Sequence, residues 1–73
     1  MPNLTDVEKA ERLAINLARG NIRHYWVVRV LDHFLAVPKP IMGGLSVLVL
    51  KEFLIKIGCA VEAEFDETGK RSR

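Results

Sequence analysis

Cys59 is the only cysteine in a chain of 73 residues, so no intramolecular disulfide can stabilise the fold. A chain of this length forms one domain at most, and it buries only about 60% of the surface that its unfolded form exposes. Its stability must come from apolar contacts, and 49% of its residues are hydrophobic. The sequence predicts a single compact domain over residues 1–65, followed by a flexible polar tail over residues 66–73.

The lone cysteine also favours a reducing compartment. The N-terminal segment MPNLTDVEKAE is acidic, whereas a secretion signal begins with basic residues and continues into an apolar core. The longest apolar stretch, Ile41 to Leu50, is far shorter than the roughly 20 residues that a membrane span requires. These features predict a cytoplasmic protein without a membrane partner.

The first expected element is a helix over Asp6 to Arg19. Thr5 and Glu8 match the capping box, in which each side chain accepts a hydrogen bond from the other residue's backbone amide. Gly20 suits the position just after a helix end. One side of this helix is apolar and comprises Val7, Ala10, Leu13, Ala14, Leu17 and Ala18.

A second helix is expected over Ile22 to Ala36, capped by Asn21. Its apolar residues cover more than half of the circumference, which is typical of a central helix. The run from His24 to Val30 is rich in β-branched and aromatic residues, and it would also suit a strand. An i,i+4 apolar series that continues through Phe34 favours the helix.

Two prolines and two glycines then form a loop, namely Pro38, Pro40, Gly43 and Gly44. Ser46 is positioned to cap a third helix over Val47 to Ile57, which Gly58 would end. The segment Leu45 to Leu50 would also suit a buried strand, and its periodicity does not decide between the two.

Residues Ala60 to Phe65 alternate in the manner of a strand. We expect apolar side chains on one side (Val61, Ala63 and Phe65) and solvated carboxylates on the other (Glu62 and Glu64). Its partner is expected within the domain, at Pro40–Met42 or Leu45–Val49, although an unpaired edge would also recruit another protein. The predicted fold is thus α+β: a small helix-dominated domain of about three helices with a short C-terminal strand segment.

No residue pattern predicts catalysis. Cys59 lies in an apolar segment, where a cysteine usually acts as a small buried hydrophobic residue. His24 and His33 are nine residues apart, which places them on opposite sides of a helix and prevents them from sharing a metal. Gly43 and Gly44 do not match a phosphate-binding loop. We therefore expect no enzyme activity, no catalytic residue, no metal site and no cofactor.

Two groups of residues are candidates for binding a partner. The first is basic and lies on the first helix and just after it: Lys9, Arg12, Arg19 and Arg23. The second is the edge of the C-terminal strand: Val61, Glu62, Ala63 and Glu64. The net charge of +2 is too small to indicate nucleic-acid binding by itself.

From MPNLTDVEKAERLAINLARGN through HYWVVRVLDHF to the KRSR end, the chain resembles small phage-encoded regulators that bind host RNA polymerase, such as those of lytic Xanthomonas phages. The resemblance implies a non-enzymatic protein that binds the polymerase near the β′ N-terminus and the β flap. It implies inhibition of σ-dependent initiation, promotion of antitermination, and at most indirect contact with nucleic acid. No contact residue can be carried over, because no diagnostic motif marks one.

Two other functions remain open. A DNA-binding repressor of helix-turn-helix type would use the helix Val47–Ile57, but that helix offers few polar groups for reading bases. The connection from Val37 to Leu45 is also longer than the ~3–4-residue turn of that motif. A dimerisation module would follow if the apolar second and third helices exceed what one small core can bury. The oligomeric state is therefore not decided by the sequence.

Overall fold

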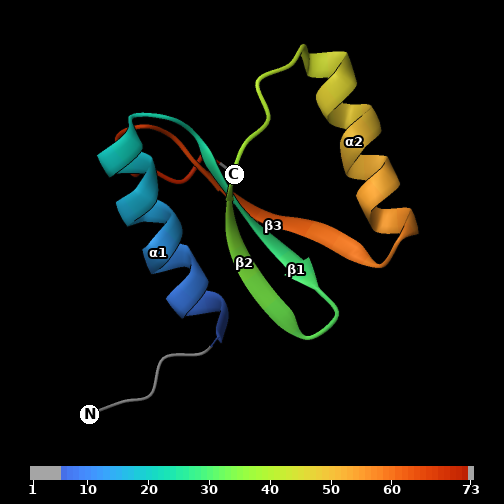
Figure 1. Ribbon diagram of the computed structural model, residues 1–73, viewed down its shortest axis with the longest axis horizontal. Coiled ribbons are helices and arrows are strands. Elements are labelled where there is room, and N and C mark those ends of the chain that lie inside the picture. Colours follow the sequence, from blue (N-terminus) through green and yellow to red (C-terminus); the bar gives the residue numbers. More distant parts are fainter. Residues whose placement is uncertain (1–5, 73) are drawn as a thin grey trace.

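The computed structural model describes residues 6–72, which form two helices and a three-stranded antiparallel sheet (Figure 1). The elements are α1 (Asp6–Asn21), β1 (Tyr25–Val30), β2 (His33–Pro38), α2 (Gly44–Lys56) and β3 (Cys59–Phe65). The fold is α+β, as expected. The prediction of a helix-dominated domain with about three helices is wrong, because the second expected helix does not form.

The segment expected as a central helix is instead the hairpin of β1 and β2. The two strands pair antiparallel, with Tyr25 opposite Pro38 and Val30 opposite His33. The connecting residues are Leu31 and Asp32, and Leu31 has a φ of 58°. Because both faces of β1 are covered, its β-branched and aromatic residues pack well as a strand, and this outweighs the i,i+4 pattern.

Strand β1 lies in the centre of the sheet, in the order β2-β1-β3. The C-terminal strand was expected and is present, but its partner is β1. The expected pairing with Pro40–Met42 or Leu45–Val49 is therefore wrong. Residues 45–50 belong to helix α2, which settles the choice between helix and strand for that segment.

The two helices lie on opposite faces of the sheet and create two small cores. On the α1 side, the fully buried Ala14 and Ala18 let the helix approach the sheet closely. On the α2 side, Trp26 is 1% exposed and packs with Val28 and Val47. The expected helix near the N-terminus is confirmed, and its apolar side faces the sheet. Thr5 of the expected capping box lies outside the described residues.

A β-bulge in β3 changes which side chains face each core. Val27 pairs with Ala63 and Val28 pairs with Val61, so Glu62 is an extra residue without a partner in β1. As a result Val61 packs on the α2 side, whereas Ala63 packs on the α1 side. The predicted alternation is therefore wrong for Val61, which does not share the face of Ala63 and Phe65, and for Glu64, which is buried and not solvated.

Glycines mark both ends of α2. Gly43 is the N-cap and provides no side-chain hydrogen bond, so Ser46 is not the cap that the sequence suggested. Gly58, with a φ of 89°, follows the helix end as expected, because glycine adopts this conformation without steric cost.

Residues 66–72, expected as a polar tail, make a hydrogen-bonded turn after β3. The Asp66 carboxylate accepts hydrogen bonds from the Thr68 amide and hydroxyl and from the Lys70 amide. The bond from the Thr68 hydroxyl is the main cause of the lowered pKa of Asp66. The Ser72 amide then donates to the Glu64 carbonyl, which brings the chain back alongside β3.

Candidate functional site

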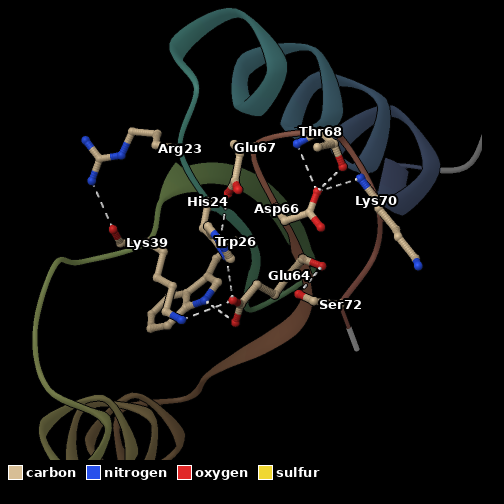
Figure 2. Close-up of polar contacts among 10 residues, drawn as sticks. All are labelled: Arg23, His24, Trp26, Lys39, Glu64, Asp66, Glu67, Thr68, Lys70 and Ser72. Carbon is tan, nitrogen blue, oxygen red and sulfur yellow. Dashed lines mark hydrogen bonds and ion pairs between the residues drawn. The ribbon is translucent and has the colours of Figure 1, made fainter.

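Glu64 is the one buried charged side chain among residues 6–72, with 8% exposure. Its Oε1 accepts the indole N–H of Trp26 at 3.1 Å, and its Oε2 lies 3.0 Å from His24 Nδ1 and 3.1 Å from Lys39 Nζ (Figure 2). Burial raises the pKa of Glu64, but the hydrogen bonds from His24, Lys39 and Trp26 outweigh it and lower the pKa overall. The carboxylate is therefore held ionised, which does not suit a general acid.

This cluster joins three parts of the chain that are distant in sequence. His24 precedes β1, Lys39 follows β2, and Glu64 lies in β3. His24 Nε2 also lies 3.0 Å from the Glu67 carboxylate in the C-terminal turn. In the described part of the chain, no three His, Cys, Asp or Glu side chains are grouped so that they could hold a metal ion. The arrangement orders the loops at one end of the sheet.

Three of the four predicted basic residues share the outer face of α1. Lys9, Arg12 and Arg19 are exposed there, opposite the buried alanines, and we call them the basic face. Arg23 does not belong to it, because its guanidinium donates to the Lys39 carbonyl at 3.0 Å. Arg71 lies near the basic face and forms an ion pair with Glu11 at 2.8 Å.

The four predicted strand residues are not brought together on one surface. Val61 packs on the α2 side and Ala63 is buried on the α1 side. Glu64 is buried in the cluster described above. Glu62 is exposed at the bulge, where its carboxylate accepts from Arg29 Nε at 3.0 Å.

A groove lies between α1 and β2, with a volume of about 590 Å³; we call it the edge groove. Its apolar wall includes Leu13 and Phe34, and Asp6 and Lys9 stand at the helix side. Sequence reasoning missed this site because it depends on β2, which was assigned to a helix. The available signals were the β-branched and aromatic content of the preceding segment and Pro38, which is tolerated in an edge strand.

The outer edge of β2 has no partner strand within residues 6–72. The Lys39 amide donates to the His24 carbonyl at 3.0 Å, and bonded and non-bonded pairs alternate along an antiparallel ladder. Pairs Ala36–Val27 and Phe34–Arg29 are therefore non-bonded, so Phe34 and Ala36 direct their backbone N–H and C=O groups toward the open edge.

Helix α2 exposes apolar side chains over most of its surface. Only Val47 is buried, and the half-buried Leu50 and Leu54 pack beside it. Lys51 Nζ lies 5.5 Å from the centre of the Trp26 ring, which adds a cation–π contact to this attachment. The exposed large apolar residues of the helix and its C-cap are Leu45, Leu48, Val49, Phe53, Ile55 and Ile57.

The helix-turn-helix interpretation required helices over residues 22–36 and 47–57. The first of these segments is the β1–β2 hairpin, so that motif does not form there. Among the described helices, none is both long and apolar enough to cross a membrane. Comparisons with known protein families, curated proteins and solved structures find no match for this chain.

Proposed function

We propose that the protein is a non-enzymatic regulator of transcription that docks on bacterial RNA polymerase in the host cytoplasm. We infer the docking function from the open edge of β2, which lies beside the edge groove. An open strand edge with an adjacent apolar groove is the arrangement by which several domains bind an extended peptide as an additional strand.

The geometry supports strand addition in two ways. Phe34 and Ala36 supply outward N–H and C=O groups that would otherwise have to be satisfied by water. The groove between β2 and Leu13 of α1 provides room for apolar side chains at alternate positions of the added strand. Main-chain hydrogen bonds would supply affinity, and these side chains would supply specificity.

The choice of RNA polymerase rests on the sequence resemblance, which implies binding near the β′ N-terminus and the β flap. The basic face suits a partner of opposite charge, since exposed charges at the rim of an interface mainly accelerate association. The expected result of binding is inhibition of σ-dependent initiation and read-through of terminators. Contact with nucleic acid would be indirect, through the polymerase.

Calorimetry with purified polymerase, with and without σ, tests the proposal. Ala36→Pro removes one outward N–H but leaves the bonds to β1, so it should weaken binding while the domain stays folded. Leu13→Asp places a charge in the edge groove and should weaken binding at least about tenfold, the loss expected for ~1.4 kcal/mol. Leu48→Asp is the matched control, because Leu48 is 56% exposed on α2 and lies outside the groove, whereas Leu13 is 52% exposed.

The basic face is tested by reversing Arg12 and Arg19 to glutamate. Association should slow, and its dependence on salt should decrease, because electrostatic steering is lost. Lys56→Glu on α2 is the charge-reversal control. If the wild-type protein has no affinity for polymerase with or without σ, the proposal is wrong. If it instead shifts duplex DNA on its own, a DNA-binding function replaces it.

A further inference from the structure

We propose that helix α2 is the interface of a homodimer, a property separate from polymerase docking. The interface is formed by what we call the α2 stripe: Leu45, Val49, Phe53 and Ile57. These residues are spaced i,i+4, so they form one continuous ridge along the helix. Their exposed fractions are 78%, 60%, 55% and 56%, respectively.

The α2 stripe lies apart from the residues that attach the helix to the sheet. Val47, Leu50 and Leu54 face the α2-side core, and the stripe begins on the opposite side of the helix at Leu45 and winds along one flank. In Figure 1, α2 stands beside β3 with its outer side away from the sheet. No described segment of the chain covers that side.

A recess adjoins the α2 stripe, and three residues of the stripe line it. A pocket of about 490 Å³ is lined by Met42, Leu45, Ser46, Val49, Leu50 and Phe53. Because Phe53 lines this pocket and is 55% exposed, a twofold axis would let the Phe53 ring of each copy pack against the pocket of the other. Such self-complementarity is what an interface with twofold symmetry requires.

The exposed area matches what a dimer needs. The stripe together with Met42, which is 44% exposed and lines the same pocket, presents on the order of 500 Å² of apolar surface. A standard interface buries ~800 Å² per partner, and roughly 65% of it is apolar in homodimers. The apolar area of the stripe is thus close to the roughly 500 Å² of apolar surface in such an interface. A monomer's largest apolar patch is typically about 300–600 Å², so this surface lies at the upper end of that range.

The charges on α2 favour a second copy over a lipid surface. The helix carries only Lys51, Glu52 and Lys56, so two copies would meet without strong repulsion. A helix that lies on a membrane surface has a broad polar face rich in lysine and arginine. The polar residues of α2 do not form such a face, because Lys51 points toward the Trp26 ring.

Sedimentation equilibrium of the wild-type chain is the primary experiment. We expect a dimer, with twice the chain mass of 8.2 kDa, that dissociates on dilution. Phe53→Asp and Val49→Asp should each raise the dimer dissociation constant at least about 30-fold, the effect of losing a hot-spot residue. Ile55→Asp is the matched control, because Ile55 is 66% exposed but lies off the stripe, and the dimer should persist.

A second measurement does not depend on any variant. Amide chemical shifts of the wild-type protein, followed by NMR on dilution, should change in residues 41–57 and not around the edge groove. A wild-type chain that stays monomeric at all concentrations overturns the proposal, whether or not it binds anionic vesicles. So does an Ile55→Asp variant that dissociates as strongly as Phe53→Asp, or a dilution response centred on another surface. None of these results bears on binding to polymerase.

Discussion

The indole N–H of Trp26 donates to Oε1 of Glu64 at 3.1 Å, and these two residues lie directly opposite each other in the β1–β3 pair. Trp26 is 1% exposed and Glu64 is 8% exposed, so the bond lies in the α2-side core. A buried carboxylate is tolerated here because Lys39 and His24 also contact it, which satisfies its charge. The pair therefore links core packing to the loops at one end of the sheet.

Glu64→Gln should destabilise the domain at neutral pH by about 1–3 kcal/mol, because a charge-assisted contact with Lys39 is lost in a mostly buried site. The pKa of Glu64 is lowered in the folded state. Its contribution is therefore present above the unfolded pKa, and it is lost as pH falls from about 5 through the folded pKa. Urea unfolding between pH 7 and pH 3 should show a smaller loss of stability in the variant than in the wild type.

Glu62→Gln is the control for that experiment. Glu62 also forms an ion pair, but its side chain is 38% exposed and that of Arg29 is 43% exposed. Exposed pairs of this kind contribute about 0–1 kcal/mol. If the stability of the Glu62 and Glu64 variants depends on pH in the same way, Glu64 is not the source of the pH-dependent stability.

Trp26→Ala should cost ~3–5 kcal/mol, as expected for truncation of a large buried aromatic side chain. The total stability of a small domain is often near the low end of ~5–15 kcal/mol, so this variant should be largely unfolded. Trp26→Phe retains most of the packing but removes the N–H donor to Glu64, and it should cost less. Thermal unfolding by circular dichroism distinguishes the two. A Trp26→Ala variant with an unchanged melting temperature would contradict the buried position.

Ile22→Asn should stabilise the protein. Ile22 has a φ of 52° and is 76% exposed, so a β-branched residue occupies a left-handed conformation without compensating burial. Asparagine adopts this conformation more readily, and a gain of ~1 kcal/mol would raise the melting temperature by roughly 4–8 °C in a domain of this size. Ile22→Val retains the β-branch and should give no such gain.

Gly69→Ala and Gly20→Ala should have opposite effects. Gly69 has a φ of 83°, and an added Cβ would lie 2.8 Å from Arg19 Cδ and 3.0 Å from Ile15 Cγ2. We expect a loss of stability of ~1 kcal/mol or more. A Cβ at Gly20 would meet no atom within 4 Å, and this glycine lies inside α1, so alanine should add about 0.5–1 kcal/mol. Chemical denaturation measures both. If both substitutions raise, or both lower, the free energy of unfolding, this explanation of the two glycines is wrong.

The parts of the fold that depend on local sequence were predictable. Helix α1 was expected over Asp6–Arg19 and is observed over Asp6–Asn21, because its apolar stripe and polar outer face are both local patterns. Gly58 ended α2 as expected, for a steric reason that needs no tertiary contact. The C-terminal strand was recognised from its alternation, although the bulge later disturbs that alternation.

The hairpin was not predictable in the same way. Residues 24–34 satisfy both a helical period and a strand composition, and the choice is made by packing between α1 and α2. Its connecting residues, Leu31 and Asp32, lack the glycine or asparagine that usually marks a tight hairpin turn. The edge groove could not be predicted for the same reason, because it forms only where β2 lies beside α1.

The burial of Glu64 also depends on distant residues. Its contacts come from Trp26 and Lys39, which are 38 and 25 residues away in sequence. No local pattern reports such contacts. The exposed apolar surface of α2 was partly foreseen, since the sequence showed a helix that is apolar nearly all round. Which residues of that helix face water became clear only from the position of the sheet.

The bulge at Glu62 gives β3 one residue more than the part of β1 with which it pairs. Without Glu62, Val61 and Ala63 would be consecutive residues of a regular strand, and they would still lie on opposite faces of the sheet. Glu64 would remain opposite Trp26, and Phe65 would remain opposite Tyr25. Deletion of Glu62 should therefore leave both cores intact, whereas an insertion elsewhere in β3 would turn the residues on one side of it to the opposite face. Over evolutionary time, this strand is free to lose a residue at the bulge but not to gain one.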